Sequence, residues 1–192
     1  MSSILLAGPG TSVWEEQSRL QGTRSLPLSE PGREQVREVA SQVARIPLRF
    51  IYTSPSEHCR ESAEILGHGR RTRIRCLDDL EEVDQGLWEG LELEELERQY
   101  GRAFRTWRHD PSKVRPPQGE SMGEAYERAR RLVRKLARRH GDEVVVIVAP
   151  RLMRALIQCC LRGLGPEDAW KVYQEKSDWE VVAVPDQLAG KA

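Results

Sequence analysis

The sequence lacks an excess of charge of either sign, because 30 lysines and arginines balance 30 aspartates and glutamates. A protein that binds nucleic acid regardless of sequence needs surplus cations to displace counterions from phosphates, so this balance argues against that class. Long apolar runs are also missing, since none approaches the roughly 18–20 residues that span a bilayer. Met1 to Ala7 contain no basic residue, so we do not expect this start to be a signal peptide. We therefore expect no nucleic-acid partner and no membrane association.

Cysteine is scarce: there are four, and no two have the CxxC spacing of a metal or redox site. Cys159 and Cys160 are adjacent in an apolar helical stretch, where a free cysteine commonly packs as a small hydrophobic residue. We expect reduced, structural thiols in a cytoplasmic protein, with no metal and no cofactor.

What the sequence does contain is an alternation of short apolar runs and amphipathic stretches. Strands are indicated at residues 3–7, 49–53, 73–77, 144–149 and 180–184. The run 144–148 has no polar alternation, which is typical of a strand covered on both faces. Apolar residues three and four positions apart indicate helices at 36–43, 125–136 and 152–160. The pattern predicts an α/β fold of three layers, with a mostly parallel central sheet and helices on both of its faces.

The middle of the chain has a different composition. Residues 80–121 are acidic, then basic and aromatic, and they end in Pro-Pro-Gln-Gly-Glu-Ser. This composition favours a helical insertion within a single domain of residues 1–192 rather than a second folding unit. We expect the tail, residues 185–192, to be frayed.

Two turns stand where a parallel sheet places its ligands, just beyond the carboxyl ends of strands. One is the glycine-rich stretch 8–12 after the first strand, and the other is 149–154 after the long apolar strand. The first is not a phosphate-binding loop of the GxxxxGK[ST] type, because the spacing is absent and Pro9 has no backbone N–H to offer.

These turns also belong to a set of motifs that resembles a known family. Residues 8–15 and 19–22 are similar to an RHGxTxWN…RLQG opening, and residues 27–35 to PLTxxGxxQ. Residues 54–63 resemble SxLxRAxxTA, residues 80–90 resemble LxE…GxWEG, and residues 104–121 resemble FxxWxxDP…PPGGES. The order and spacing identify the chain as similar to the histidine phosphatase superfamily, in its phosphoglycerate-mutase-like branch.

The resemblance implies a set of site positions, several of which hold other residues here. In the family a histidine becomes a phosphohistidine, an arginine before it and one from SxLxRA bind the phosphoryl group with a second histidine, and a glutamate is the general acid. The nucleophile position is Pro9, the two arginine positions are Gly8 and His58, and the second histidine position is Pro150, or Ala149 in a shorter loop. Only the acid is retained, as Glu82.

These departures predict a catalytically inactive protein with no catalytic residue, because a broken catalytic unit typically loses about a million-fold in rate. It would bind a small anionic ligand or a protein partner, with Gln21, Gly22, His58, Glu82 and Arg151 as the ligand-binding residues. One alternative is an active phosphomonoesterase with a rebuilt mechanism that uses Glu82 and His58. Another is a structural or assembly module. The sequence leaves open whether Arg60, Arg151 or Arg154 enters the pocket.

Overall fold

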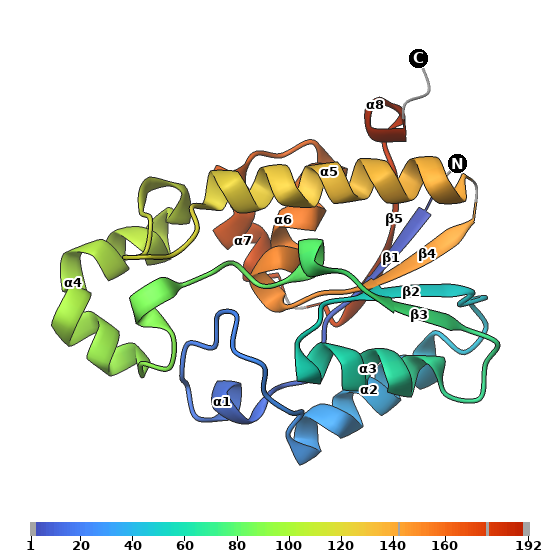
Figure 1. The fold of residues 1–192 in the computed structure, drawn as a ribbon, viewed down its shortest axis with the longest axis horizontal. Helices are drawn as coiled ribbons and strands as arrows, with labels where there is room; N and C mark the ends of the chain where they lie inside the picture. Colours follow the sequence, from blue (N-terminus) through green and yellow to red (C-terminus); the bar gives the residue numbers. More distant parts are fainter. Residues whose placement is uncertain (1–2, 142, 176, 190–192) are drawn as a thin grey trace.

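The computed structural model describes residues 3–141, 143–175 and 177–189, and its centre is a sheet of five strands (Figure 1). The strands are β1 (Ser3–Ala7), β2 (Phe50–Thr53), β3 (Arg73–Cys76), β4 (Val144–Val148) and β5 (Trp179–Ala183). Their order is β3-β2-β4-β1-β5. Three pairings are parallel, and β5 alone pairs antiparallel, with β1. The predicted α/β fold with a mostly parallel sheet is confirmed.

Helices cover both faces of this sheet, which places α5 (Met122–His140) and α6 (Arg151–Arg162) opposite α2 (Glu30–Gln42) and α3 (Glu57–Gly67) (Figure 1). Because side chains alternate along a strand, β4 contributes to two cores. Val145 and Ile147 pack with the α5–α6 side, whereas Val146 and Val148 pack with the α2–α3 side. The apolar run of β4 therefore lies at the middle of the sheet, as its sequence predicts.

Local signals set where the longer helices begin and end. The Ser29 side chain caps α2 by accepting a hydrogen bond from the Gly32 N–H, and a proline stands in the first turn. Ser121 and Glu124 form a reciprocal capping box at the start of α5. Gly141 ends α5 with a φ of 54°, a value that glycine adopts without strain.

The segment 80–121 contains α4 (Leu93–His109) and two short 3-10 turns, Gly86–Trp88 and Pro111–Lys113. The buried Trp88 ring contacts the rings of Tyr100, Phe104 and Trp107, so an aromatic cluster joins α4 to the α5–α6 core. A side chain at Gly86 would lie 2.1 Å from the Pro117 carbonyl oxygen, so the two ends of the segment touch through backbone. The segment is thereby closed on itself and packed against the α5–α6 core.

The C-terminal part of the described chain contains α7 (Ala169–Tyr173) and α8 (Asp186–Ala189); the short α1 (Val13–Glu16) follows β1. The sequence predicts a frayed tail from residue 185, yet residues 186–189 form α8. Leu188 explains the difference, because its side chain is buried in the core that also holds α5. Residues 190–192 lie outside the described residues. None of the helices described in residues 3–141, 143–175 and 177–189 is both long and apolar enough to cross a membrane.

Candidate functional site

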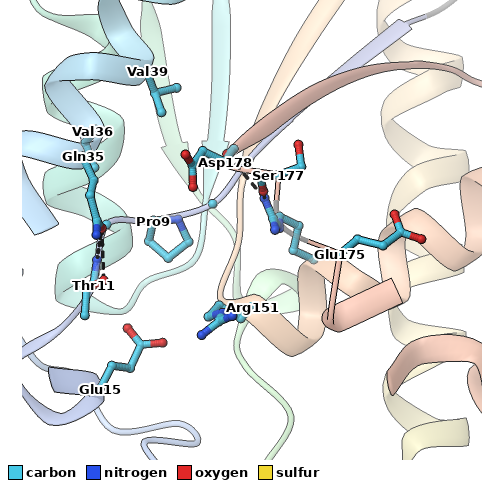
Figure 2. A pocket seen from close by; sticks show the side chains of 13 residues that line it. Pro9, Thr11, Glu15, Gln35, Val36, Val39, Arg151, Glu175, Ser177 and Asp178 are labelled. Carbon is cyan, nitrogen blue, oxygen red and sulfur yellow. Dashed lines mark hydrogen bonds between the residues drawn. The ribbon is translucent and has the colours of Figure 1, made fainter. Parts of the chain in front are cut away.

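The carboxyl ends of β1 and β4 lie side by side, and the chain after each of them borders a cavity of about 450 Å³. Gly8, Pro9, Gly10 and Thr11 form one side of this cavity, and Arg151, from the first turn of α6, forms part of another. Figure 2 shows the Pro9 ring, the Glu15 carboxylate and the Arg151 guanidinium around the same space.

A second cavity of about 230 Å³ adjoins the first, because Glu15 and Arg151 line both. Its walls come from the loop after α1, from the segment 80–121 and from α7. Gln21, Gly22, Glu82 and Arg151, which the sequence predicts to bind a ligand, all line this smaller cavity. The structure thus brings four of the five predicted residues together.

Glu82 is held at the N-terminus of α6. The backbone N–H groups of Leu152 and Met153 donate hydrogen bonds to its two carboxylate oxygens at 3.0 and 2.8 Å, and the Val83 N–H donates a third at 2.9 Å. Burial nevertheless raises the pKa of Glu82 to about 7, against the effect of these hydrogen bonds, and the nearby Glu15 charge raises it further. The carboxyl group therefore exchanges its proton near neutral pH.

His58, the fifth predicted residue, lines neither cavity. Its ring is buried near the start of α3, where Nδ1 lies 3.3 Å from the Gln21 amide nitrogen. Burial lowers its pKa to about 4, so the imidazole is neutral at physiological pH. At the position where the resemblance implies a phosphate-binding arginine, the chain holds an uncharged ring that supports Gln21 from behind the cavity wall.

The Arg154 guanidinium lies close beside Gly8. A Cβ at Gly8 would lie 3.2 Å from the Arg154 Nη1 atom. The same Nη1 donates hydrogen bonds to the carbonyls of Ser177 at 2.6 Å and Asp178 at 3.3 Å. Within the described chain, the buried Nε of Arg154 has no hydrogen-bond partner. This arginine thus lies at the 450 Å³ cavity with part of its hydrogen-bonding capacity unused.

The three arginines that the sequence leaves open are now placed. Arg151 lines both cavities and Arg154 lines the larger one, whereas Arg60 is exposed and lines neither. Pro150 precedes α6 as its N-cap residue, and the preceding Ala149 is buried. Neither of them lines either of the two cavities, so at this turn the positive charge comes from Arg151 and Arg154 of α6.

Sequence reasoning missed the aromatic wall of the smaller cavity. Phe104 and Trp107 reach it from α4, and Trp170 and Tyr173 reach it from α7. The Trp170 and Tyr173 rings are stacked, with centroids 4.8 Å apart, and the Arg151 guanidinium lies 4.7 Å from the Tyr173 centroid. Trp170 and Tyr173 follow the last candidate motif, and no local pattern distinguishes them from core aromatics.

Together the two cavities offer groups suited to a phosphoryl ligand. Arg151 and Arg154 in the larger cavity and Arg19 and Arg108 in the smaller one supply positive charge, against the carboxylates of Glu15, Glu175 and Asp178. Glu82 holds a proton for part of the time near pH 7. Arginine binds phosphoryl oxygens well because its donors form a planar fork. A carboxylic acid that loses its proton near neutral pH is suited to general acid catalysis.

A family model, related sequences and a solved structure each match most of this chain. The model of the family described as Histidine phosphatase superfamily (branch 1) matches residues 4–187. Phosphoserine phosphatase 1 of Hydrogenobacter thermophilus is 27% identical over 187 residues, which is 97% of this chain and 89% of that protein. An uncharacterized phosphatase, PhoE, of Bacillus subtilis is 29% identical and covers 90% of this chain and 93% of its own length. The solved structure of Bacillus stearothermophilus YhfR superposes with a TM-score of 0.84 at 28% identity, covering 88% of this chain and 84% of that one.

These comparisons correct the functional prediction made from the sequence. The departures at Gly8, Pro9, His58 and Pro150 predict a catalytically inactive binding protein, but the proteins that match nearly the whole chain are named phosphatases. They favour the alternative, an active phosphomonoesterase. Of the two residues assigned to that rebuilt mechanism, Glu82 lies in a cavity and His58 does not.

Proposed function

The chain belongs to the histidine phosphatase superfamily, branch 1, and from this we propose that it hydrolyses small phosphomonoesters, with Glu82 as the proton donor and Arg151 as a phosphoryl-binding cation. The observation that carries the proposal is the position of Glu82. Its carboxyl group is fixed by the α6 backbone at the strand ends, and it lines the same cavity as Arg151. The relatives named as phosphatases support the reaction class.

The reaction is a single displacement by water. The water oxygen forms a bond to phosphorus, and the bond between phosphorus and the alcohol oxygen breaks. Glu82 gives its proton to the departing alcohol oxygen and recovers one from the dihydrogen phosphate that forms, so the products are the alcohol and hydrogen phosphate. Arg151 stabilises the charge that develops on the phosphoryl oxygens.

Two features favour water over a phosphohistidine as the route. Pro9 stands at the position that the family resemblance assigns to the nucleophile, and a proline side chain carries no nucleophilic atom. None of the four histidines, all of which lie in the described residues, lines either cavity. The larger cavity adjoins the smaller one at Glu15 and Arg151, and it gives water an approach to a phosphoryl group bound there.

The state of the cysteines bears on the compartment in which the protein acts. We assign it to the reducing cytoplasm, which suits its four free cysteines, three of them buried.

The test compares purified wild type with Glu82→Gln on alkyl phosphates, with phosphate release as the readout. We expect turnover by the wild type and a fall in kcat of roughly 10²–10⁴-fold in the variant, the usual contribution of a general acid. Glu81→Gln is the matched control, since Glu81 is the exposed neighbour. Acid-labile phosphoprotein should be absent. A Glu82→Gln variant as active as the wild type, or a wild type that hydrolyses no member of the series, would overturn the proposal.

A further inference from the structure

The aromatic wall of the 230 Å³ cavity is continuous from α4 to α7. Phe104 and Trp107 stack with centroids 6.2 Å apart and an interplanar angle of 14°, Trp107 and Trp170 are 5.3 Å apart, and Trp170 stacks on Tyr173 at 10°. Phe104 and Trp107 are almost fully buried, whereas Trp170 and Tyr173 are half-buried. Two helices that are far apart in the sequence thus contribute rings to one surface.

The reacting groups lie along the same cavity. Glu82 and Arg151 line it together with the four rings, and Arg151 lies over the Tyr173 ring. A phosphomonoester with its phosphoryl group at Arg151 and its bridging oxygen at Glu82 has its organic group directed toward the rings. The cavity is therefore positioned to bind the alcohol part of the substrate.

We propose that this cavity selects phosphomonoesters whose alcohol carries a single aromatic ring, or a flat apolar group of the same size. This inference rests on the proposed function and names its substrate class. Flat groups pack well against stacked rings, and such aromatic contacts add to the free energy gained by removing apolar area from water. A polar alcohol stacked on the ring faces would lose hydrogen bonds to water there, and only the polar lining residues Arg19, Gln21, Gln85 and Arg108 could replace them.

The volume of the cavity also limits how large the alcohol part of the substrate can be. An apolar cavity of about 150 Å³ holds one benzene molecule, and sites for drug-sized ligands begin at roughly 300 Å³. At about 230 Å³ the cavity accommodates one ring with a short linker.

The decisive experiment compares benzyl phosphate with ethyl phosphate, because both release a primary alcohol of weak acidity and differ chiefly in the ring. We expect kcat/KM to be about 10- to 100-fold higher for benzyl phosphate, the gain that burying a phenyl-sized group supplies. Phosphoserine serves as the polar comparison and should resemble ethyl phosphate. Equal kcat/KM for all three, with turnover intact, would refute the inference and leave the proposed phosphatase function standing.

Variants of the aromatic wall test whether these rings cause the preference for benzyl phosphate over ethyl phosphate. Tyr173→Leu and Trp170→Leu should each reduce the benzyl-to-ethyl ratio, whereas Tyr173→Phe keeps a ring and should retain it. Phe50→Leu is the control, since Phe50 packs against His140 and lines neither cavity. Thermal melts verify that each variant folds. A ratio that stays unchanged in both leucine variants would overturn the assignment.

A binding measurement tests the aromatic site independently of phosphate ester hydrolysis. Benzylphosphonic acid is not hydrolysed, and its binding is followed by the quenching of tryptophan fluorescence, to which Trp107 and Trp170 contribute. We expect saturable quenching that ethylphosphonic acid does not produce and that Trp170→Leu diminishes. If that pattern appears while no ester is hydrolysed, the proposed function fails and the aromatic site stands. Equal binding of the two phosphonates would refute the aromatic site.

Discussion

Replacing Glu82 by glutamine should change how the stability of the protein depends on pH. Burial raises the pKa of this carboxyl from 4.5 to about 7, in spite of three backbone N–H donors. The folded protein therefore holds a proton that the unfolded chain releases as pH rises above about 4.5. The wild type has the full contribution of neutral Glu82 below this pH and loses it progressively up to about pH 7.

The magnitude follows from the difference between the two pKa values. A difference of roughly 2.5 pH units, at about 1.4 kcal/mol for each, makes the cost of ionising Glu82 in the folded state approximately 3 kcal/mol. Glutamine carries no charge at any pH and avoids this cost. The free energy of unfolding of Glu82→Gln, minus that of the wild type, should therefore rise by approximately 3 kcal/mol between about pH 4.5 and 8.

Because His58 also contributes, the difference in unfolding free energy between Glu82→Gln and the wild type is more informative than the pH dependence of either protein alone. Burial lowers its pKa from 6.5 to about 4, so the unfolded chain binds the additional proton in this range. Its contribution to stability rises with pH, opposite in sign to that of Glu82. Between about pH 4.5 and 6.5 the Glu82 and His58 contributions to the free energy of unfolding nearly cancel in the wild type. The His58 contribution is the same in Glu82→Gln, so subtracting the two free energies removes it.

Urea denaturation at a series of pH values measures this difference, with Glu81→Gln as the control. The control should follow the wild type, because Glu81 is exposed. The reasoning is refuted if the difference between Glu82→Gln and the wild type stays constant or falls with pH. That result would mean that the three N–H donors outweigh burial and that Glu82 is ionised at pH 5.

The proton on Glu82 also predicts that kcat/KM for an alkyl phosphate falls about tenfold per pH unit above pH 7, which a pH–rate profile checks. Ser29→Ala should lower the free energy of unfolding by about 1 kcal/mol in urea melts, because the cap of α2 is lost. Gly10→Ala should lower it by about 1–3 kcal/mol, since the new Cβ would lie 2.1 Å from the Gly32 carbonyl oxygen. Gly123→Ala should be neutral or stabilising in the same melts, since its Cβ would meet nothing within 4 Å beyond its neighbours and the nearby backbone of α5.

The sequence predicts the strands well where burial on both faces dictates composition. The predicted range 3–7 is β1 itself, and the predicted 144–149 exceeds β4 by one residue. The antiparallel direction of β5 was not predictable from its residues, because direction depends on how the chain returns after α7. Residues 186–189 form α8 where the sequence favours a frayed end, because the burial of Leu188 depends on a long-range contact with the α5 side of the core.

The sequence likewise predicts only those parts of the candidate site that follow motifs. Gln21, Gly22, Glu82 and Arg151 follow recognisable motifs, and the structure brings them to one cavity. His58 also follows a motif, but packing encloses its ring, and motif spacing carries no information about which way a ring turns. The stacked rings of α7 reach the cavity only through tertiary packing.

The juxtaposition of Gly8 and Arg154 constrains how this sequence can change over evolutionary time. A Cβ on residue 8 would lie 3.2 Å from the Arg154 Nη1 atom, a tight contact that requires the guanidinium to shift by a few tenths of an ångström. The family resemblance implies an arginine at residue 8, and here the guanidinium comes from α6 instead. A lineage that restores a long side chain at residue 8 must move or shorten the side chain of residue 154 that lies beside it. We therefore expect the effect of a substitution at residue 8 on stability to depend on the residue at position 154.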